Sequence, residues 1–214
     1  RKCADYGIMV DIHDEYRPTG LSRTLPNLMT QEGIAGNETM PDARHNTTLP
    51  FTRFLAGPAD YTPCYFNNRV KATHGHQLAM PVVYYSPITF LYWYDTPQLY
   101  RGEKELDFWK HVPTTWDETY PIDGQIGEYV AIARRSGQKW FVGVMNGMDA
   151  RTLSLPTKFL QRGKKYVVTL YEDDPDLDTR TKVATRQKTI KGGQSLKLEL
   201  QASGGAAMEI EKAP

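Results

Sequence analysis

The sequence predicts an α/β fold in the first half of the chain and an antiparallel all-β fold in the second half. Residues 7–12 (GIMVDI) are a short apolar run that begins at a glycine and is rich in β-branched side chains, as in strands covered by helices on both faces. Near Thr115 the hydrophobic pattern changes, and segments that alternate like strands follow one another between turn residues. We therefore expect two domains, residues 1–114 and residues 115–214.

The first half alternates between strand and helix signals. Further strands are expected at residues 28–30 and 88–93, and helices at residues 48–55, from residue 73 onward, and at residues 103–110. Thr48 and Thr73 are suitable N-caps for the first two of these helices. Pro81 is expected to end or kink the second helix, because a proline ring removes a helical hydrogen bond.

The second half contains a tight hairpin signal. Ser136-Gly137 separates two alternating segments, residues 129–135 and 139–145. Later alternating segments lie at residues 166–171, 181–190, 195–200 and 206–210. These patterns predict an antiparallel β-sandwich.

Acidic side chains gather where the first two strands are expected to end. His13 and Asp14 follow the first strand, Glu32 follows the second, and Glu38 lies six positions further on, in a glycine-containing loop. In α/β barrels the carboxyl ends of the strands carry the chemistry. The spacing therefore predicts an active site built from carboxylates.

Five blocks of sequence carry a resemblance to a known family. They are residues 13–38 (HDEYRPTGLSRTLPNLMTQEGIAGNE), 45–63, 76–87, 112–119 and 126–146. Together they closely resemble glycoside hydrolase family 97, in the order in which the family has them.

The resemblance implies a fold and a place within a longer enzyme. Members of the family are considerably longer, with an N-terminal β-sandwich and a catalytic (β/α)8 barrel ahead of a small β-domain. Residues 1–114 then resemble the C-terminal portion of the barrel, and residues 115–214 resemble the C-terminal antiparallel β-sandwich domain. The missing N-terminal β-sandwich and barrel portion are expected partners. A periplasmic or cell-envelope location in a bacterium is expected, with the export signal outside this chain.

The resemblance also implies roles for the carboxylates. Glycoside hydrolysis needs a proton donor and a second carboxylate that attacks the sugar or activates water. The family's proton donor maps onto Glu38, and its Ca2+ ligands map onto Asp14, Glu32 and Glu38. By residue type alone, Glu38 is more often a solvated loop carboxylate, and Glu32 can equally well be a strand-end residue bonded to loop amides.

Asp14 bears on the stereochemistry of the reaction. Inverting α-glucosidases of the family have a glutamate here that serves as general base, and aspartate is shorter by one methylene. We therefore expect an exo-acting, retaining α-galactosidase, whose nucleophile is an aspartate on an earlier strand that this chain does not include. Asp14 stays the possible base if the enzyme inverts.

Substrate contacts are less specific. His13, Arg17 and Arg23 are candidates for binding an oligosaccharide or α-glycoside, although the arginines could instead form salt bridges that pin the loop and His13 could be an ordinary hydrogen-bonded histidine. Aromatic residues could also stack on a sugar, but most aromatics belong to the core; the candidates are Tyr16, Tyr61, Tyr65 and Trp116.

Composition excludes some classes of function. Lys and Arg number 26 and Asp and Glu 25, which gives a net charge of +1 without a basic run, so no nucleic acid partner is expected. The longest strongly apolar stretches, such as residues 88–94, are too short to span a membrane. A carbohydrate-binding module and a purely structural fragment are the alternatives. A binding module would expose a planar set of aromatics, whereas a structural domain would bury Tyr129, Trp140 and Phe141.

Overall fold

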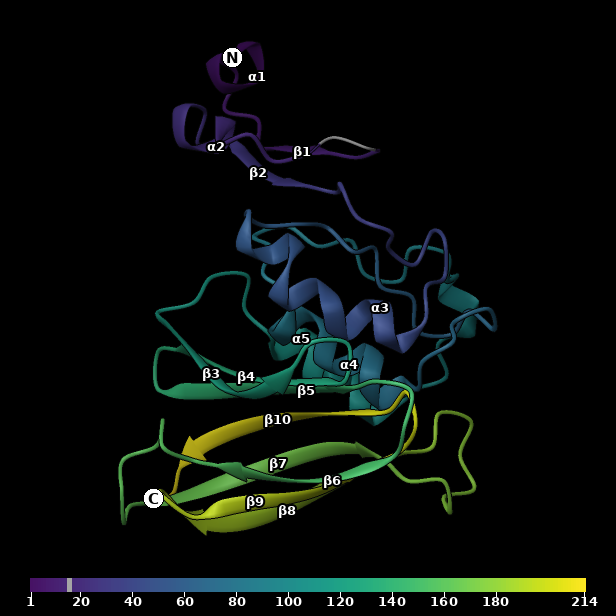
Figure 1. Cartoon of the computed structure of the whole chain (residues 1–214), viewed down its shortest axis with the longest axis vertical. Helices are drawn as coiled ribbons and strands as arrows, with labels where there is room; N and C mark the ends of the chain where they lie inside the picture. The colour runs from purple at the N-terminus through teal and green to yellow at the C-terminus, as the bar shows by residue number, and fades with distance from the viewer. Residues whose placement is uncertain (15–16) are drawn as a thin grey trace.

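The computed structural model describes residues 1–14 and 17–214, and it divides into a short α/β part and an antiparallel β-sheet domain (Figure 1). The α/β part contains α1 (Lys2–Asp5), β1 (Val10–Ile12), α2 (Leu21–Thr24), β2 (Leu28–Gln31), α3 (Ala43–Thr48), η1 (Leu49–Phe51), η2 (Arg53–Leu55), α4 (His74–Val83), η3 (Pro97–Leu99), η4 (Lys104–Leu106) and α5 (Asp107–His111). The β-domain contains β3 (Glu118–Gln125), β4 (Tyr129–Ser136), β5 (Lys139–Asn146), β6 (Arg151–Pro156), β7 (Lys165–Asp173), β8 (Val183–Lys191), β9 (Ser195–Leu200) and β10 (Gly205–Lys212).

The two strands β1 and β2 form a parallel pair at one end of the molecule, as the sequence predicts (Figure 1). In their register Ile12 lies opposite Gln31, so the residues that follow both strands emerge at the same edge. The expectation that helices cover both faces of β1 is wrong for this chain, because all three residues of β1 are partly exposed.

Helix α4 begins at the N-cap that the sequence predicts. Thr73 accepts a hydrogen bond from the backbone N–H of His76, and the helix continues through Pro81 to Val83. The predicted cap at Thr48 is wrong. The carboxylate of Asp42 accepts from the backbone N–H of His45 and begins α3 earlier, and the following residues form two 3-10 turns instead of one helix.

The prediction of a strand at residues 88–93 is also wrong. Among the described residues this segment pairs with no strand. Its backbone turns at Tyr92, which has a φ of 61°, and the backbone N–H of Phe90 donates to the buried carboxylate of Asp60 instead of to a neighbouring strand. The aromatic run therefore forms a loop, in which the rings of Phe90 and Trp93 lie against His13, directly after β1.

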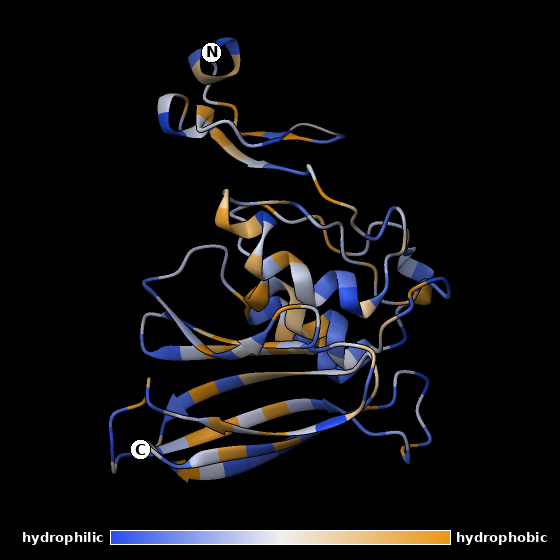
Figure 2. Ribbon diagram, in the orientation of Figure 1, coloured by the Kyte–Doolittle hydropathy of each residue, from blue (hydrophilic) through white to orange (hydrophobic). Residues whose placement is uncertain are grey.

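The β-domain consists of two facing antiparallel sheets, which confirms the predicted fold class. Six strands form the larger sheet in the order β3-β4-β5-β10-β7-β8, and β6 and β9 form the smaller one. Sequence reasoning found the hairpin β4–β5 and the strands from β7 to β10, and it missed β3 and β6. Apolar side chains between the two sheets form the largest core cluster, and the alternation of apolar and polar residues along the strands is visible in Figure 2.

Helix α4 covers the other face of the larger sheet (Figure 1). Along β5, Trp140, Val142 and Val144 belong to the core between the sheets, whereas Phe141 and Met145 pack toward the helices. This explains why β5 is buried on both faces and reads as a continuous apolar run. Among the described residues, no helix has both the length and the apolar character needed to cross a membrane.

Aspartate 173 joins α4 to the β-domain. Its carboxylate accepts hydrogen bonds from the backbone N–H of Gly75 (2.9 Å), from the hydroxyl of Thr73 (2.6 Å) and from the backbone N–H of Gly205 (2.8 Å). The first turn of α4 is thereby fixed to the end of β7 and the start of β10. The segment around α4 and the β-domain thus share one continuous packing.

Candidate functional site

The parallel pair β1–β2 brings the predicted carboxylates to one edge. The backbone N–H of Glu32 donates to the carbonyl of Ile12 (2.8 Å), which extends the pairing past the ends of both strands. The backbone N–H of Asp14 then donates to Oε2 of Glu32 (2.6 Å). Asp14 has a φ of 70°, a left-handed conformation that aspartate tolerates better than most residues.

His13 lies beside both glutamates. Its Nδ1 is 3.7 Å from Oε2 of Glu32 and 3.9 Å from Oε1 of Glu38. These three side chains form a group whose donor atoms could hold a cation. A cavity of about 460 Å³ opens above them, lined by Asp14, Arg17, Glu32, Gly33, Ile34, Ala35 and Glu38. Four of the predicted site residues therefore line one cavity, with His13 adjacent to it.

Arg23 lies elsewhere. It belongs to α2 and lines a different cavity, between the strand β2 and the turn at Gly57-Pro58. The structure therefore does not bring its guanidinium to the carboxylates.

The two glutamates differ in exposure. Glu32 is only 5% exposed. Burial raises the pKa of its carboxyl group, although the hydrogen bond from the backbone of Asp14 acts in the opposite direction. The side chain of Glu38 is 34% exposed. One carboxylate is thus enclosed at the strand end, and the other can reach a bound molecule.

A partly buried arginine that sequence reasoning missed holds the strand end in place. The guanidinium of Arg53 donates to five backbone carbonyls, those of Gln31, Glu32, Gly33, Gly57 and Pro58. These carbonyls belong to two segments, residues 31–33 and residues 57–58. Because Arg53 bonds to both segments, it fixes the backbone from which Glu32 projects. Nothing in the local sequence distinguishes Arg53 from a solvated arginine.

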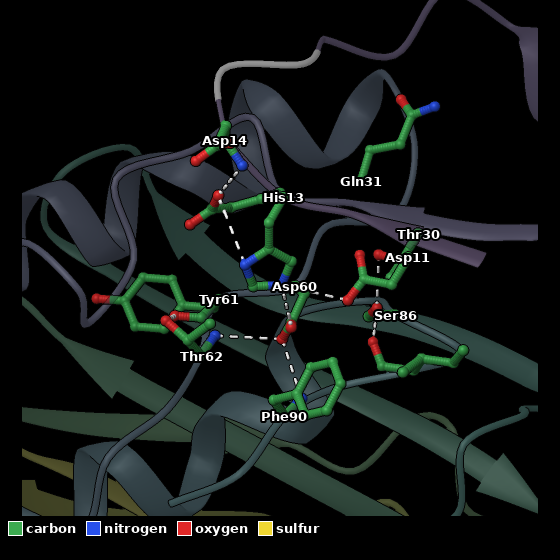
Figure 3. Close-up of polar contacts among 12 residues, drawn as sticks. Asp11, His13, Asp14, Thr30, Gln31, Asp60, Tyr61, Thr62, Ser86 and Phe90 are labelled. Atoms are coloured by element: carbon green, nitrogen blue, oxygen red, sulfur yellow. Dashed lines mark hydrogen bonds and ion pairs between the residues drawn. The ribbon is translucent and has the colours of Figure 1, made fainter. Parts of the chain in front are cut away.

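Two further carboxylates lie behind His13 (Figure 3). Nε2 of His13 is 2.9 Å from Oδ2 of Asp60 and 3.3 Å from Oδ2 of Asp11. Burial and the charge of Asp60 raise the pKa of Asp11 to about 6. Burial alone would lower the pKa of His13, but the hydrogen bond to Asp60 and the surrounding acidic charges outweigh it and raise that pKa.

Aromatic residues surround the histidine but do not match the predicted ones. Trp93 stacks on the ring of His13, with centroids 5.3 Å apart. Tyr61 and Tyr65 are buried in the core, and Trp116 packs against Phe141. The remaining candidate, Tyr16, lies outside the described residues. For Asp60, the one sequence signal of a functional role was its place in the block at residues 45–63. Trp93 belongs to a run that has the pattern of a strand.

Models of known protein families match both parts of this chain. The family model described as "Glycoside hydrolase 97" matches residues 1–34, and the model described as "Glycosyl-hydrolase 97 C-terminal, oligomerisation" matches residues 115–211. The chain belongs to glycoside hydrolase family 97. It corresponds to the end of the catalytic domain followed by the C-terminal domain, as the resemblance implies.

A curated relative and two solved structures are similar along almost the whole chain. A retaining alpha-galactosidase of Bacteroides thetaiotaomicron is 34% identical, over 98% of this chain and 34% of that protein. A family 97 enzyme of Pseudoalteromonas sp. strain K8, solved in complex with acarbose, matches with a TM-score of 0.89 and 31% identity, over 99% of this chain and 36% of the other. A beta-arabinopyranosidase matches with a TM-score of 0.84 and 28% identity, over 97% of this chain and 35% of the other. The chain spans about a third of the length of these relatives.

Proposed function

We propose that this chain is part of an exo-acting, calcium-dependent α-glycoside hydrolase, specifically a retaining α-galactosidase. The observation that carries the proposal is the meeting of Glu32, Glu38 and His13 at the carboxyl ends of the parallel strands β1 and β2. Barrel enzymes place their reacting groups at this edge. The name of the relative from Bacteroides thetaiotaomicron supports the choice of sugar and stereochemistry.

Glu38 is the proposed general acid/base. Its carboxylate is partly exposed beside the cavity, so it can approach the oxygen of a leaving group. Asp11 is a poor candidate for the nucleophile, because both of its oxygens are buried behind His13. The attacking carboxylate is therefore assigned to the part of the enzyme outside this chain, at roughly 5–5.5 Å from Glu38 if the reaction retains configuration.

Calcium is proposed to bind through Glu32, Glu38 and Asp14. Calcium prefers six to eight oxygen ligands, and these three carboxylates line the same cavity. The enclosure of Glu32, which disfavours its charged form, suits a cation that would compensate the charge. A bound cation would hold the carboxylates in fixed positions around the sugar.

Sugar contacts are proposed for His13 and Arg17, which lie at or beside the cavity. Arg23 lines the second cavity, so no sugar contact in this pocket is proposed for it. An inverting α-glucosidase of the same family is the second candidate, because Asp14 lines the cavity and could act as a base from there.

A carbohydrate-binding module finds less support. Throughout residues 115–214, all of which the structure describes, no aromatic side chain belongs to the exposed large hydrophobic residues. Trp140 and Phe141 are buried, and Tyr129 is partly buried against the core. The domain thus lacks the exposed aromatic platform that sugar stacking requires, which favours a supporting role.

Proton NMR of the products tests the proposal. The full-length enzyme containing this chain is given an α-galactoside and, separately, an α-glucoside, and the anomer released first is followed. We expect turnover of the α-galactoside with the α-anomer appearing first, because a covalent intermediate gives net retention. Initial release of the β-anomer would contradict retention and return Asp14 to the role of base.

A further inference from the structure

A buried aspartate contacts the ring nitrogen of His13 that points away from Glu32 and Glu38. Asp60 is 0% exposed, and its Oδ2 is 2.9 Å from Nε2 of His13. The other ring nitrogen, Nδ1, faces Glu32 and Glu38. The imidazole therefore connects a buried carboxylate with the candidate active site.

The backbone fixes the Asp60 carboxylate in turn. Its Oδ1 accepts from the backbone N–H of Thr62 (3.2 Å) and of Phe90 (3.1 Å), which leaves Oδ2 directed at His13. Asp11 also lies near Nε2, but neither of its oxygens has a hydrogen-bond partner among the described residues. Asp60 is thus the acidic neighbour whose direction the surrounding chain determines.

Aromatic contacts fix the plane of the His13 ring. Trp93 stacks on it with an interplanar angle of 24°, and Phe90 meets it edge-on with centroids 6.1 Å apart. These contacts allow the ring to flip by half a turn, which would exchange the two sides. The flip would put a ring carbon in place of each nitrogen, so the hydrogen bond of Nε2 with Asp60 selects one of the two orientations.

We propose that Asp60 is a positioning residue, whose carboxylate keeps a proton on Nε2 of His13 and so presents Nδ1 to the sugar. An ionised carboxylate only accepts hydrogen bonds, so Nε2, which is 2.9 Å from Asp60, must carry the hydrogen, whereas Nδ1 lies 3.7 and 3.9 Å from the glutamates, beyond hydrogen-bond distance. Nδ1 is then the atom available to a substrate hydroxyl beside Glu32 and Glu38. The inference rests on the proposed function, because it takes His13 as a substrate-binding residue.

Asp60→Asn tests this with little change of shape. The two backbone donors hold the oxygen of the new amide, so its NH2 group faces Nε2 of His13. Nε2 must then accept, and the proton moves to Nδ1. We expect kcat/KM of the full-length enzyme to fall about 10–100-fold, by analogy with the loss of a residue that orients a metal-ligating histidine.

Asp173→Asn is the matched control. Asp173 is also a carboxylate that accepts backbone hydrogen bonds, but it holds Gly75 and Gly205 instead of His13. Both variants should lower the melting temperature, and only Asp60→Asn should lower kcat/KM beyond twofold. An equal loss of kcat/KM in the two variants would reduce Asp60 to a structural residue and overturn the proposal.

A double-mutant cycle asks whether Asp60 acts through His13. In a His13→Gln background, Asp60→Asn should cause no further loss of kcat/KM, because the group that it orients has gone. Losses that simply multiply would contradict the proposal.

The tautomer of His13 provides a readout independent of catalysis. Long-range proton–nitrogen NMR spectra of the full-length enzyme with 15N-labelled histidine, assigned by His13→Gln, should show Nε2 protonated in the wild type and not in Asp60→Asn. A wild-type ring without a proton on Nε2 would overturn the inference. If the enzyme hydrolyses no α-glycoside, the proposed function fails, and these spectra still decide the role of Asp60.

Discussion

Glu38 sits on a loop that is anchored just before the carboxylate. The backbone N–H of Asn37 donates to the carbonyl of Tyr61 (3.1 Å), and its side-chain amide donates to Gln77 (3.0 Å). Asn37 is itself only 1% exposed. A functional carboxylate benefits from such a fixed support, because small displacements of reacting groups cost large factors in rate.

Glu38→Gln should therefore remove acid catalysis without displacing the loop. In the full-length enzyme we expect a loss of about 10²–10⁴-fold on substrates with poor leaving groups, which need protonation. Activated aryl glycosides should be affected much less in the step that breaks the glycosidic bond. Pre-steady-state measurement of that step on both classes of substrate checks the assignment, and equal losses would argue against it.

Among the elements, α4 carries a buried histidine at its junction with the β-domain. Nδ1 of His76 lies 3.1 Å from the carbonyl of Gly204, which can only accept, and Nε2 lies 3.2 Å from the side-chain amide of Asn46. The hydroxyl of Tyr61 donates to the carbonyl oxygen of that amide, so the amide nitrogen faces Nε2. His76 is therefore neutral, with its proton on Nδ1. Burial lowers its pKa to about 4.

This lowered pKa predicts a loss of stability in mild acid. Between about pH 6.5 and pH 4 the unfolded chain binds a proton at His76 that the folded chain does not, so the free energy of unfolding falls as the pH falls. The contribution is at most about 3 kcal/mol. Urea unfolding of the full-length enzyme at pH 7 and pH 5 should show a smaller difference in His76→Gln than in the wild type. An unchanged difference would show that His76 is not the group that titrates.

At the scale of the whole molecule, the parallel pair β1–β2 stands at the end opposite the β-domain (Figure 1). It is connected to the rest through polar contacts, such as that of His13 with Asp60 and those of Arg53 with the end of β2. The proposed calcium site lies in the same region. Its ligands come from the end of β1, the end of β2 and the loop that bears Glu38, so a bound ion would connect all three.

Removal of calcium should consequently loosen this end more than the β-domain. A ligand that binds only the folded state stabilises it by about 2.7 kcal/mol at a concentration 100-fold above its Kd. In the full-length enzyme, chelation should lower the melting temperature and the activity. Amide hydrogen exchange should quicken at β1 and β2, whereas exchange in β4 and β5 should stay slow. Calorimetry that detects no calcium binding, together with unchanged exchange, would refute the site.

The sequence alone determined the features that depend on neighbouring residues. The two-residue period and the Ser136-Gly137 turn predict β4 and β5, and the threonine cap predicts the start of α4. In the sequence, His13 and Glu32 each follow directly after a predicted strand. Parallel strands end at the same edge of a sheet, so this order places both residues at one edge. These signals depend on residues that are close together in the sequence, so they can be interpreted without knowing the path of the chain.

Tertiary structure alone decided the groups that surround the site. Asp60 reaches His13 from 47 positions away, and Arg53 reaches Glu32 from 21 positions away. The segment at residues 88–93 has the composition of a strand, yet it forms a loop because Asp60 binds its backbone and Tyr92 turns it. Propensity is a weak local preference that tertiary contacts override. Which distant carboxylate or guanidinium meets a given backbone group depends on the path of the whole chain, and no local pattern records it.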